Sequence, residues 1–247
     1  MKTNEREAQI ISLLREQSFL SVQELAARLY VSPSSIRRDL TRLESLGIVK
    51  RNYGGVVAAG GNPTAPPIAI RSEVNKAAKR TIAKKASALL RDGLSVLLDD
   101  STTAAAMVEF LAEHREVTLF TNNIETALDA TARGLRTYLL GGALPTDSAT
   151  VTVGGFALDM LRSIHVDLCF FSASALSDAG DLFDSTEAHN LLRREMIRRA
   201  DTRVLLCDSS KFLRSSLYRS VHVDDIDYIC TDAPLPAQIT VKKAKIL

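Results

Sequence analysis

Long apolar runs are missing from this 247-residue sequence. No stretch approaches the roughly 20 apolar residues that a membrane-spanning helix needs. Residues 1–7 are charged where a secretory signal peptide would become apolar. We therefore expect a cytoplasmic protein with no membrane partner.

Cysteine and histidine are scarce, and neither forms a ligand pattern. The three cysteines are odd in number, widely spaced and without a C-x-x-C pair: Cys169, Cys207 and Cys230. We expect buried, reduced thiols, because each lies in or beside an apolar run. The four histidines are scattered without metal-ligand or catalytic-triad spacing: His114, His165, His189 and His222. The sequence thus predicts no metal, no cofactor and no catalytic residue.

Positive charge is concentrated at the front of the chain. Residues 1–58 hold nine Lys and Arg against six Asp and Glu, a net charge of +3, whereas residues 59–247 hold 22 against 23, a net charge of −1. Residues 59–70 contain two glycines and three prolines and lack both charge and apolar periodicity. We expect a domain over residues 1–58, a linker over 59–70 and a second domain over 71–247.

The amino-terminal domain is predicted to contain three helices and a β-hairpin. Apolar periodicity predicts a first helix over residues 4–17, and Ser21 with Glu24 has capping-box spacing at the start of the second. Ser32 and Pro33 supply the N-cap and first residue of a third helix, which ends at Gly47. Residues 48–57 are predicted to form two short strands around a glycine turn. This arrangement is typical of a winged helix-turn-helix.

The third helix exposes hydroxyl and guanidinium groups together in its first two turns. Such groups suit phosphates and guanine edges in the major groove, and the hairpin adds basic and aromatic residues. The predicted DNA contacts are Ser32, Ser34, Ser35, Arg37, Arg38, Thr41, Arg42, Lys50, Arg51 and Tyr53. The alternative is an ordinary solvated face on which Asp39 and Glu44 pair with Arg42 or Arg38.

The second domain alternates strand-like apolar runs with helical patterns. The predicted strands are Ser95–Leu98, Val117–Phe120, Thr137–Leu140, Asp167–Phe171, Val204–Cys207 and Tyr228–Thr231, with helices notably over 75–90, 103–112 and 186–200. Such alternation predicts an α/β fold with a mostly parallel sheet covered by helices.

Polar segments follow several of these strands. Because the carboxyl ends of parallel strands share one edge of the sheet, we expect their side chains to converge there. Residues 101–103 in particular combine hydroxyl groups with the start of a helix, which suits a phosphate. An ordinary N-cap is the alternative.

Motifs along nearly the whole chain resemble the DeoR family of bacterial sugar-metabolism repressors. In the first domain they are Val31–Leu40 with its Ile-Arg-Arg-Asp-Leu core, Leu43–Arg51 and Gly54–Val57. In the second they include Asp99 with Ser101–Thr103, Thr121–Asn123, Leu140–Gly142, Val153-Gly154, Phe183-Asp184 with Glu187-Ala188, Asp208–Phe212 and Thr231–Ala233. The family's sensor domain is similar in fold to sugar-phosphate isomerases.

The resemblance implies which residues bind a phosphorylated sugar effector. Ser101, Thr102 and Thr103 would hold the phosphate, Asn122, Asn123 and Glu187 the sugar hydroxyls, and Lys211 an anionic or carbonyl oxygen. Asp99, Gly141 and Gly142 complete the predicted effector site. Ser101 and Ala175 replace glycines that are usual in the family, which could reshape the pocket. Each polar residue also has an ordinary explanation, namely helix capping by the asparagines, pairing of Glu187 with Arg193 or Arg194, and surface exposure of Lys211.

The function favoured by these patterns is a repressor that binds double-stranded operator DNA under the control of a sugar phosphate. A helix-turn-helix usually reads repeated half-sites, so we expect a homo-oligomer, either a dimer or a tetramer. The alternative is a sugar-phosphate isomerase or deaminase with an accessory DNA-binding unit, in which Asp99, Asp100 or Glu187 would be the base. A scaffold protein would leave the hairpin and the polar strand ends without a purpose.

Overall fold

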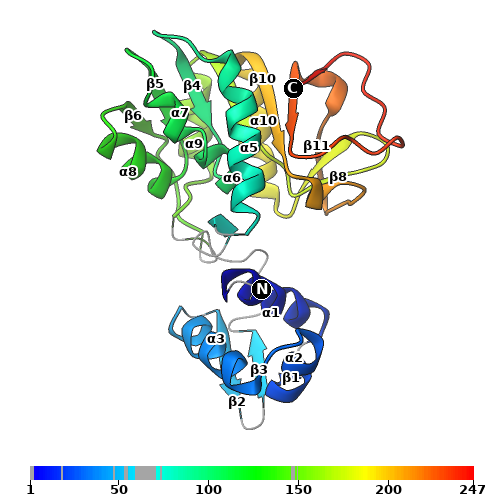
Figure 1. The fold of residues 1–247 in the computed structure, drawn as a ribbon. Coiled ribbons are helices and arrows are strands. Elements are labelled where there is room, and N and C mark those ends of the chain that lie inside the picture. Colours follow the sequence, from blue (N-terminus) through cyan, green and yellow to red (C-terminus); the bar gives the residue numbers. More distant parts are fainter. Residues whose placement is uncertain are drawn as a thin grey trace. The chain divides into compact units, whose positions relative to one another are not determined.

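The computed structural model describes residues 3–17, 19–46, 48–52, 55–58, 71, 72, 74–145, 148 and 150–247. The chain divides into two compact units, Met1–Val74 and Asn75–Leu247, each described by itself below (Figure 1). The predicted linker over residues 59–70 lies outside the described residues. Among those that are described, no helix is long and apolar enough to cross a membrane.

Over its described residues up to Ala58, the first unit forms three helices and a small antiparallel sheet. The elements are α1 Thr3–Glu16, β1 Leu20–Ser21, α2 Val22–Arg28, α3 Pro33–Ser45, β2 Val49–Asn52 and β3 Gly55–Ala58, with strand order β1-β3-β2. Leucine and isoleucine side chains from all three helices form one buried core with Val49 of β2 and Val56 of β3. This confirms the predicted helices and hairpin, to which the structure adds the short strand β1.

The caps that start the second and third helices are confirmed. The backbone N–H of Ser21 donates to Glu24 Oε2 at 2.8 Å, and the backbone N–H of Glu24 donates to Ser21 Oγ at 3.1 Å. Ser32 caps α3, and Pro33 occupies its first turn. These caps satisfy backbone donors that a helix leaves free, so they fix where α2 and α3 begin.

A parallel sheet of seven strands is the centre of the second unit. Its strands are β4 Ser95–Leu98, β5 Thr118–Thr121, β6 Arg136–Leu139, β7 Val166–Phe171, β10 Ala200–Cys207, β12 Tyr228–Thr231 and β13 Lys245–Ile246, in the order β13-β12-β10-β7-β4-β5-β6. Every pairing in it is parallel. All six predicted strands are present, with ends displaced by a few residues or fewer.

Helices cover both faces of this sheet. The helices α5 Lys76–Ala86, α6 Thr102–Ala105, α7 Val108–Leu111 and α8 Ile124–Ala132 contribute to one core. The helices α9 Gly155–Arg162 and α10 Glu187–Arg198 contribute to the other. The single helix predicted over residues 103–112 is wrong: it is broken at Met107, whose N–H bonds to the carbonyl of Ala104, three residues back.

The sequence did not predict a second, antiparallel sheet beside the large one. It consists of β8 Ala175–Leu176, β9 Asp181–Asp184 and β11 Tyr218–His222 in the order β11-β9-β8. These strands are short, so their alternation of apolar and polar residues is weak. The turns η1 Ser87–Leu89, η2 Ser209–Lys211 and η3 Val223–Asp225 complete the unit.

The three cysteines are buried and free, as predicted. Burial raises the pKa of Cys207 and of Cys230 to about 12. Their thiols therefore stay protonated at neutral pH and behave as small apolar groups.

Candidate functional site

Two arginines project unpaired from the exposed face of α3. The opposite face buries Ile36, Leu40 and Leu43 in the core, which fixes the rotation of the helix. Arg37 and Arg38 are exposed, and within the described part of the chain their guanidinium groups make no hydrogen bond or ion pair. Their donors are therefore free for an external acceptor.

The serines at the start of α3 bond to one another. Ser32 Oγ lies 2.9 Å from Ser34 Oγ and 3.0 Å from Ser35 Oγ, and it accepts from the N–H of Ser35 at 3.3 Å. Ser32 is therefore occupied as the N-cap, as its sequence position indicates. Ser34 is exposed beside Arg37 and Arg38.

The acidic residues near α3 pair differently from the alternative suggested by the sequence. Asp39 is buried and accepts a bidentate interaction from Arg6 of α1, with Arg6 Nη2 at 2.9 Å from Asp39 Oδ1. Arg42 Nη1 lies 3.6 Å from the buried Glu7 of α1. Neither acid on α3 pairs with Arg38 within the described residues, so the pairing suggested in the alternative is not formed, whereas the exposure of Arg37 and Arg38 fits both a solvated face and a DNA-binding face. Arg42 is directed partly toward α1, which leaves Arg37 and Arg38 as the freer cations.

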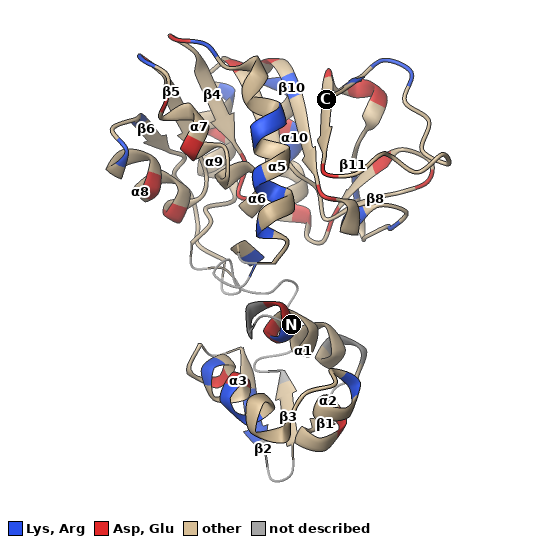
Figure 2. Cartoon of the chain, in the orientation of Figure 1, with Lys and Arg blue, Asp and Glu red and all other residues tan. Residues whose placement is uncertain are grey.

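The hairpin brings more positive charge next to α3. Lys50 and Arg51 of β2 are exposed, and Arg51 Nη1 donates to Thr41 Oγ1 at 3.3 Å. Figure 2 shows basic residues along α3 and on β2. Gly55 is required in β3, because a Cβ atom there would lie 2.5 Å from the carbonyl oxygen of Leu20. Tyr53 lies outside the described residues.

In the second unit, the order of the strands reverses between β4 and β7. The chain runs from β4 outward through β5 to β6 and then returns to β7 on the other side of β4. This is the order 3-2-1-4-5-6, in which ligands bind outside the carboxyl ends of the strands at the reversal. Asp99 follows β4 there, and Ser172 follows β7.

A buried arginine organises this reversal point. Arg193 of α10 donates through Nε to Asp99 Oδ2 at 3.1 Å, lies 3.6 Å from Asp100 Oδ1, and pairs with Asp184 of β9. Asp99 also accepts from the N–H of Ser172 at 2.9 Å and from Ser101 Oγ at 2.5 Å. Both carboxylate oxygens of Asp99 are therefore engaged, and this residue positions the loop that follows β4.

The hydroxyl-rich turn after β4 is held by its own contacts. Ser101 caps α6, because its Oγ accepts from the N–H of Ala104 at 3.0 Å. The turn itself is thus built by an ordinary cap. Thr102 is half-buried and Thr103 is buried on the same short helix. A phosphate role for these residues remains a prediction.

The asparagines after β5 differ in how they are used. Asn123 Oδ1 accepts from the N–H of Thr126 as the cap of α8, and Asn123 Nδ2 donates to the carbonyl of Asp100 at 3.3 Å. Asn122 Nδ2 donates to the carbonyl of Thr152 at 3.1 Å, whereas its buried Oδ1 has no partner among the residues that the structure describes. Capping therefore accounts for Asn123 and leaves an acceptor of Asn122 unexplained.

The remaining predicted residues lie at the same edge, with different exposure. Lys211 Nζ donates to Ser172 Oγ at 2.7 Å and lies 3.5 Å from Asp208 Oδ2, so it is tied to the end of β7. Gly141 and Gly142 follow β6, and a Cβ on Gly142 would lie 2.5 Å from the carbonyl of Val153. Glu187 is exposed in the first turn of α10. The pairing of Glu187 with Arg193 that the sequence left open is absent, because Arg193 binds the three aspartates.

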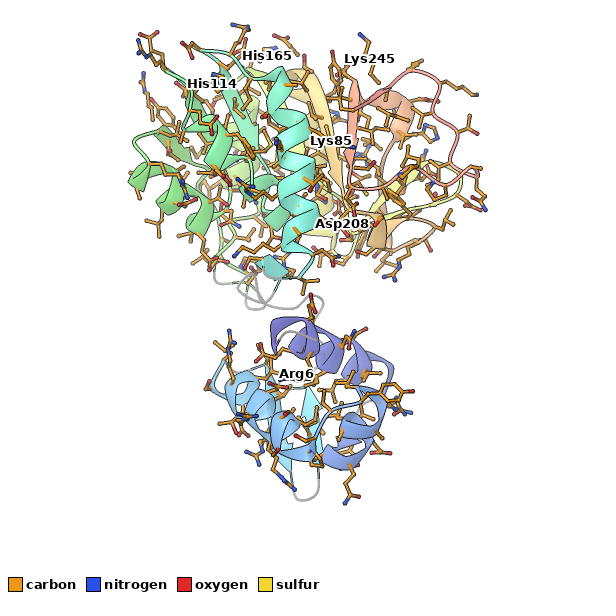
Figure 3. All side chains as sticks on the ribbon, in the orientation of Figure 1. Arg6, Lys85, His114, His165, Asp208 and Lys245 are labelled. Carbon is orange, nitrogen blue, oxygen red and sulfur yellow. The ribbon has the colours of Figure 1, made fainter. Side chains whose placement is uncertain are left out.

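The predicted effector site did not include several polar residues that the structure places at this edge, namely Asp100, Ser172, Asp184, His189 and Arg193. The one available signal was that Arg193 falls on the buried face of a predicted helix, next to Leu192. His189 Nε2 lies 3.5 Å from Asp100 Oδ2. Figure 3 places Asp208 near the carboxyl edge, whereas His165 and Lys245 lie at the opposite edge.

A cavity of about 590 Å³ opens at that opposite edge, away from all the predicted effector residues. It is lined by Arg203, Asp227, Tyr228 and Lys245 among others. Arg203 Nε donates to Asp227 at 2.8 Å, and Lys245 lies over the ring of Tyr228. Both cations therefore already have partners within the described residues.

The fold and these two sites define a class of protein, a DNA-binding transcriptional regulator with a separate sensor domain. Comparison with known families agrees with it. Residues 6–60 match the DeoR-like helix-turn-helix domain, and residues 74–233 match the DeoR C terminal sensor domain. The chain belongs to the DeoR family.

Relatives that align with this chain over most of their length are also named as transcriptional regulators. A protein of Escherichia coli O157:H7, provisionally named as the aga operon transcriptional repressor, is 34% identical, with 95% of this chain and 88% of the relative covered. The transcriptional repressor AccR of Agrobacterium fabrum (strain C58 / ATCC 33970) is 30% identical, covering 94% and 90%. The glycerol-3-phosphate regulon repressor of Escherichia coli (strain K12) is 28% identical, covering 97% and 94%.

Solved structures with a similar fold are more distant. Ribose 5-phosphate isomerase A from Methanocaldococcus jannaschii is 20% identical over 56% of this chain and 55% of its own, with a TM-score of 0.42. The translation initiation factor eIF-2B from Pyrococcus horikoshii OT3 is 14% identical over 93% and 88%, with a TM-score of 0.49.

Proposed function

We propose that this protein represses genes of carbohydrate metabolism by binding operator DNA, and that a phosphorylated sugar controls the binding. The observation that carries the proposal is that Arg37 and Arg38, on a capped helix of a DeoR-type helix-turn-helix, have no partner among the described residues. Free guanidinium groups at the start of such a helix suit guanine edges and phosphates. The repressor names of the relatives support the direction of control.

The effector site of this proposal lies outside the ends of β4, β5, β6, β7 and β10. It contains the predicted residues Asp99, Ser101, Thr102, Thr103, Asn122, Asn123, Gly141, Gly142, Glu187 and Lys211. Lys211 supplies positive charge for the phosphate, and the unpartnered Oδ1 of Asn122 supplies an acceptor beneath the crevice. One relative is named for a glycerol-3-phosphate regulon, which supports an effector with a phosphate group.

The contacts of the carboxylates support a non-catalytic role. An isomerase needs a free base next to a substrate C–H bond. Asp99 and Asp100 both face Arg193, and both oxygens of Asp99 already accept hydrogen bonds. Glu187, the third candidate base, is exposed. We therefore propose a sensor without turnover.

The experiment has two parts. Thermal shift with ribose 5-phosphate, glycerol 3-phosphate, glucose 6-phosphate and fructose 6-phosphate, each against its unphosphorylated counterpart, should find one phosphate that stabilises the protein. A ligand at 100 times its dissociation constant adds about 2.7 kcal/mol. That compound should then change the affinity for a duplex selected from a random-sequence pool.

Two results would contradict the proposal. The first is a protein that selects no duplex above non-specific binding at matched salt. The second is conversion of an aldose phosphate to its ketose, which would favour the enzyme alternative.

A further inference from the structure

Asn75 is the first residue of the sensor unit, and its side chain is used in an unusual way. It precedes α5 in the left-handed conformation, with φ 54° and ψ 31°, yet its side chain does not cap that helix. Instead, Nδ2 lies 3.3 Å from Asp208 Oδ1 and 3.3 Å from Ser210 Oγ. A side chain in the N-cap position would ordinarily accept from its own helix, so this one makes a tertiary contact in place of a cap.

Asp208 receives Asn75 on one oxygen and Lys211 on the other. Lys211 Nζ lies 3.5 Å from Asp208 Oδ2, and its ammonium group also donates to Ser172 Oγ at the end of β7. Burial would raise the pKa of Asp208, but Lys211, Ser210, Lys79 and Asn75 outweigh it and lower the pKa. Asp208 is therefore an ionised, buried link between Lys211 and Asn75.

We infer that Asn75 is a positioning residue that passes effector binding from Lys211 to the chain segment leading to the DNA-binding unit. The inference rests on the proposed function, because it requires a phosphorylated effector at Lys211. An anionic group that binds Lys211 competes with Asp208 for the same ammonium group. Asp208 then loses the cation beside its Oδ2, and the contacts of its Oδ1 with Ser210 and Asn75 change.

The change reaches the helix because Asn75 belongs to its first turn. The N–H of Lys79 donates to the carbonyl of Asn75 at 3.0 Å, so movement of Asn75 alters the start of α5. Figure 3 shows Asp208 near the amino-terminal end of α5. Asparagine suits this place because it tolerates the left-handed conformation and still carries a donor, whereas glycine tolerates it without a donor.

The test separates effector binding from its transmission. Three quantities are measured for the full chain, using the sugar phosphate that most stabilises wild type: its dissociation constant by calorimetry, operator affinity without it, and operator affinity at saturation. Asn75→Gly keeps the backbone conformation and removes the donor. For this variant we expect the dissociation constant of the sugar phosphate and the operator affinity without it to stay within about twofold of wild type. The change in operator affinity that the sugar phosphate causes should fall to a third or less of the wild-type change.

Two further variants sharpen the result. Asn75→Asp keeps the size but places a second carboxylate beside Asp208, and it should reduce the response at least as much as glycine. Lys84→Ala, on the exposed face of the same helix, should respond as wild type does. In wild type, the sugar phosphate should also change the exchange rate of the Lys79 amide at least threefold, and in Asn75→Gly it should not.

Specific outcomes would overturn the inference. A full response in Asn75→Gly with normal effector binding would show that the link does not carry the signal. Weakened effector binding in Asn75→Gly would make Asn75 part of the pocket. A wild-type protein that binds no sugar phosphate, or whose operator affinity ignores it, would refute the proposed function itself and the inference with it.

Discussion

Individual arginines of this chain have different roles, and the role of each depends on whether its side chain is buried or exposed. Arg193 is buried and contacts three aspartates, so it organises the carboxyl edge of the sheet. Arg37 and Arg38 are exposed and unpaired among the described residues, so their donors remain available. A buried arginine must be paired because an isolated buried charge is very costly, whereas an exposed one is solvated.

Replacing Arg37 and Arg38 together by alanine should abolish specific operator binding. Each bidentate base contact contributes about 1–3 kcal/mol of discrimination. The free energy of unfolding should stay within about 0.5 kcal/mol of wild type, because both side chains are exposed. Anisotropy titrations at fixed salt measure the binding. The control is the double alanine variant of Arg80 and Arg133, which removes the same charge from the sensor unit; if it weakened specific binding equally, the contact would not be local.

Replacing Lys211 by alanine should weaken the response to effector and spare operator binding without it. Loss of a charge-assisted hydrogen bond costs about 1.5–3 kcal/mol. That corresponds to roughly a tenfold or greater rise in the effector concentration needed. Effector titrations of operator binding measure it, with Lys243→Ala at the opposite edge as control. Overlapping curves would remove Lys211 from the pocket.

At the scale of elements, two ion pairs join α1 to α3, and they contribute differently to the stability of the fold. Arg6 and Asp39 form a bidentate pair. Glu7 is fully buried, and neither carboxylate oxygen accepts a hydrogen bond within the described residues. The first pair therefore orients α3, whereas Arg42 offsets only part of the cost of burying the second carboxylate.

Asp39→Ala should destabilise the DNA-binding unit strongly. Removing one partner of a buried pair costs about 3–5 kcal/mol, since Arg6 is left without its acceptor. Urea unfolding followed by circular dichroism measures the loss. Glu44→Ala, an exposed acid on the same helix, should cost no more than about 1 kcal/mol. Equal losses in both variants would show that the Arg6 contact is not important for stability.

Glu7→Gln should change how stability depends on pH. Burial raises the pKa of Glu7, so the folded state holds this proton more tightly than the unfolded chain does. The associated stability is present below the unfolded pKa and is lost as the pH rises through the folded pKa. The glutamine variant lacks this loss, so it should be at least as stable as wild type at pH 7. Unfolding at several pH values measures it, and parallel curves would contradict the prediction.

At the scale of the whole molecule, we predict a homo-oligomer. A helix-turn-helix reads two half-sites about one helical turn apart, which requires two copies related by a two-fold axis. Analytical ultracentrifugation of the free protein should give the mass of a dimer or tetramer. The complex with operator should contain an even number of chains. A monomer on a single site would be inconsistent with this prediction.

The sequence by itself determined the local structure and the class of protein. Ser21, Glu24, Ser32 and Pro33 set the helix starts, because capping involves residues only a few positions apart. Strong apolar runs likewise indicated the six main strands of the parallel sheet. The arginines of α3 could be predicted as exposed because the apolar residues of this helix recur at helical spacing and so define the opposite, buried face.

Only the tertiary structure decided the long-range pairings. Asp39 binds Arg6, 33 residues away, rather than a neighbour on its own helix. Arg193 meets Asp99 across 94 positions, and Asn75 meets Asp208 across 133. Such contacts depend on which strands become neighbours and on where their ends meet. Local propensity and spacing carry no information on either, so the organisation of the sensor edge follows from the fold.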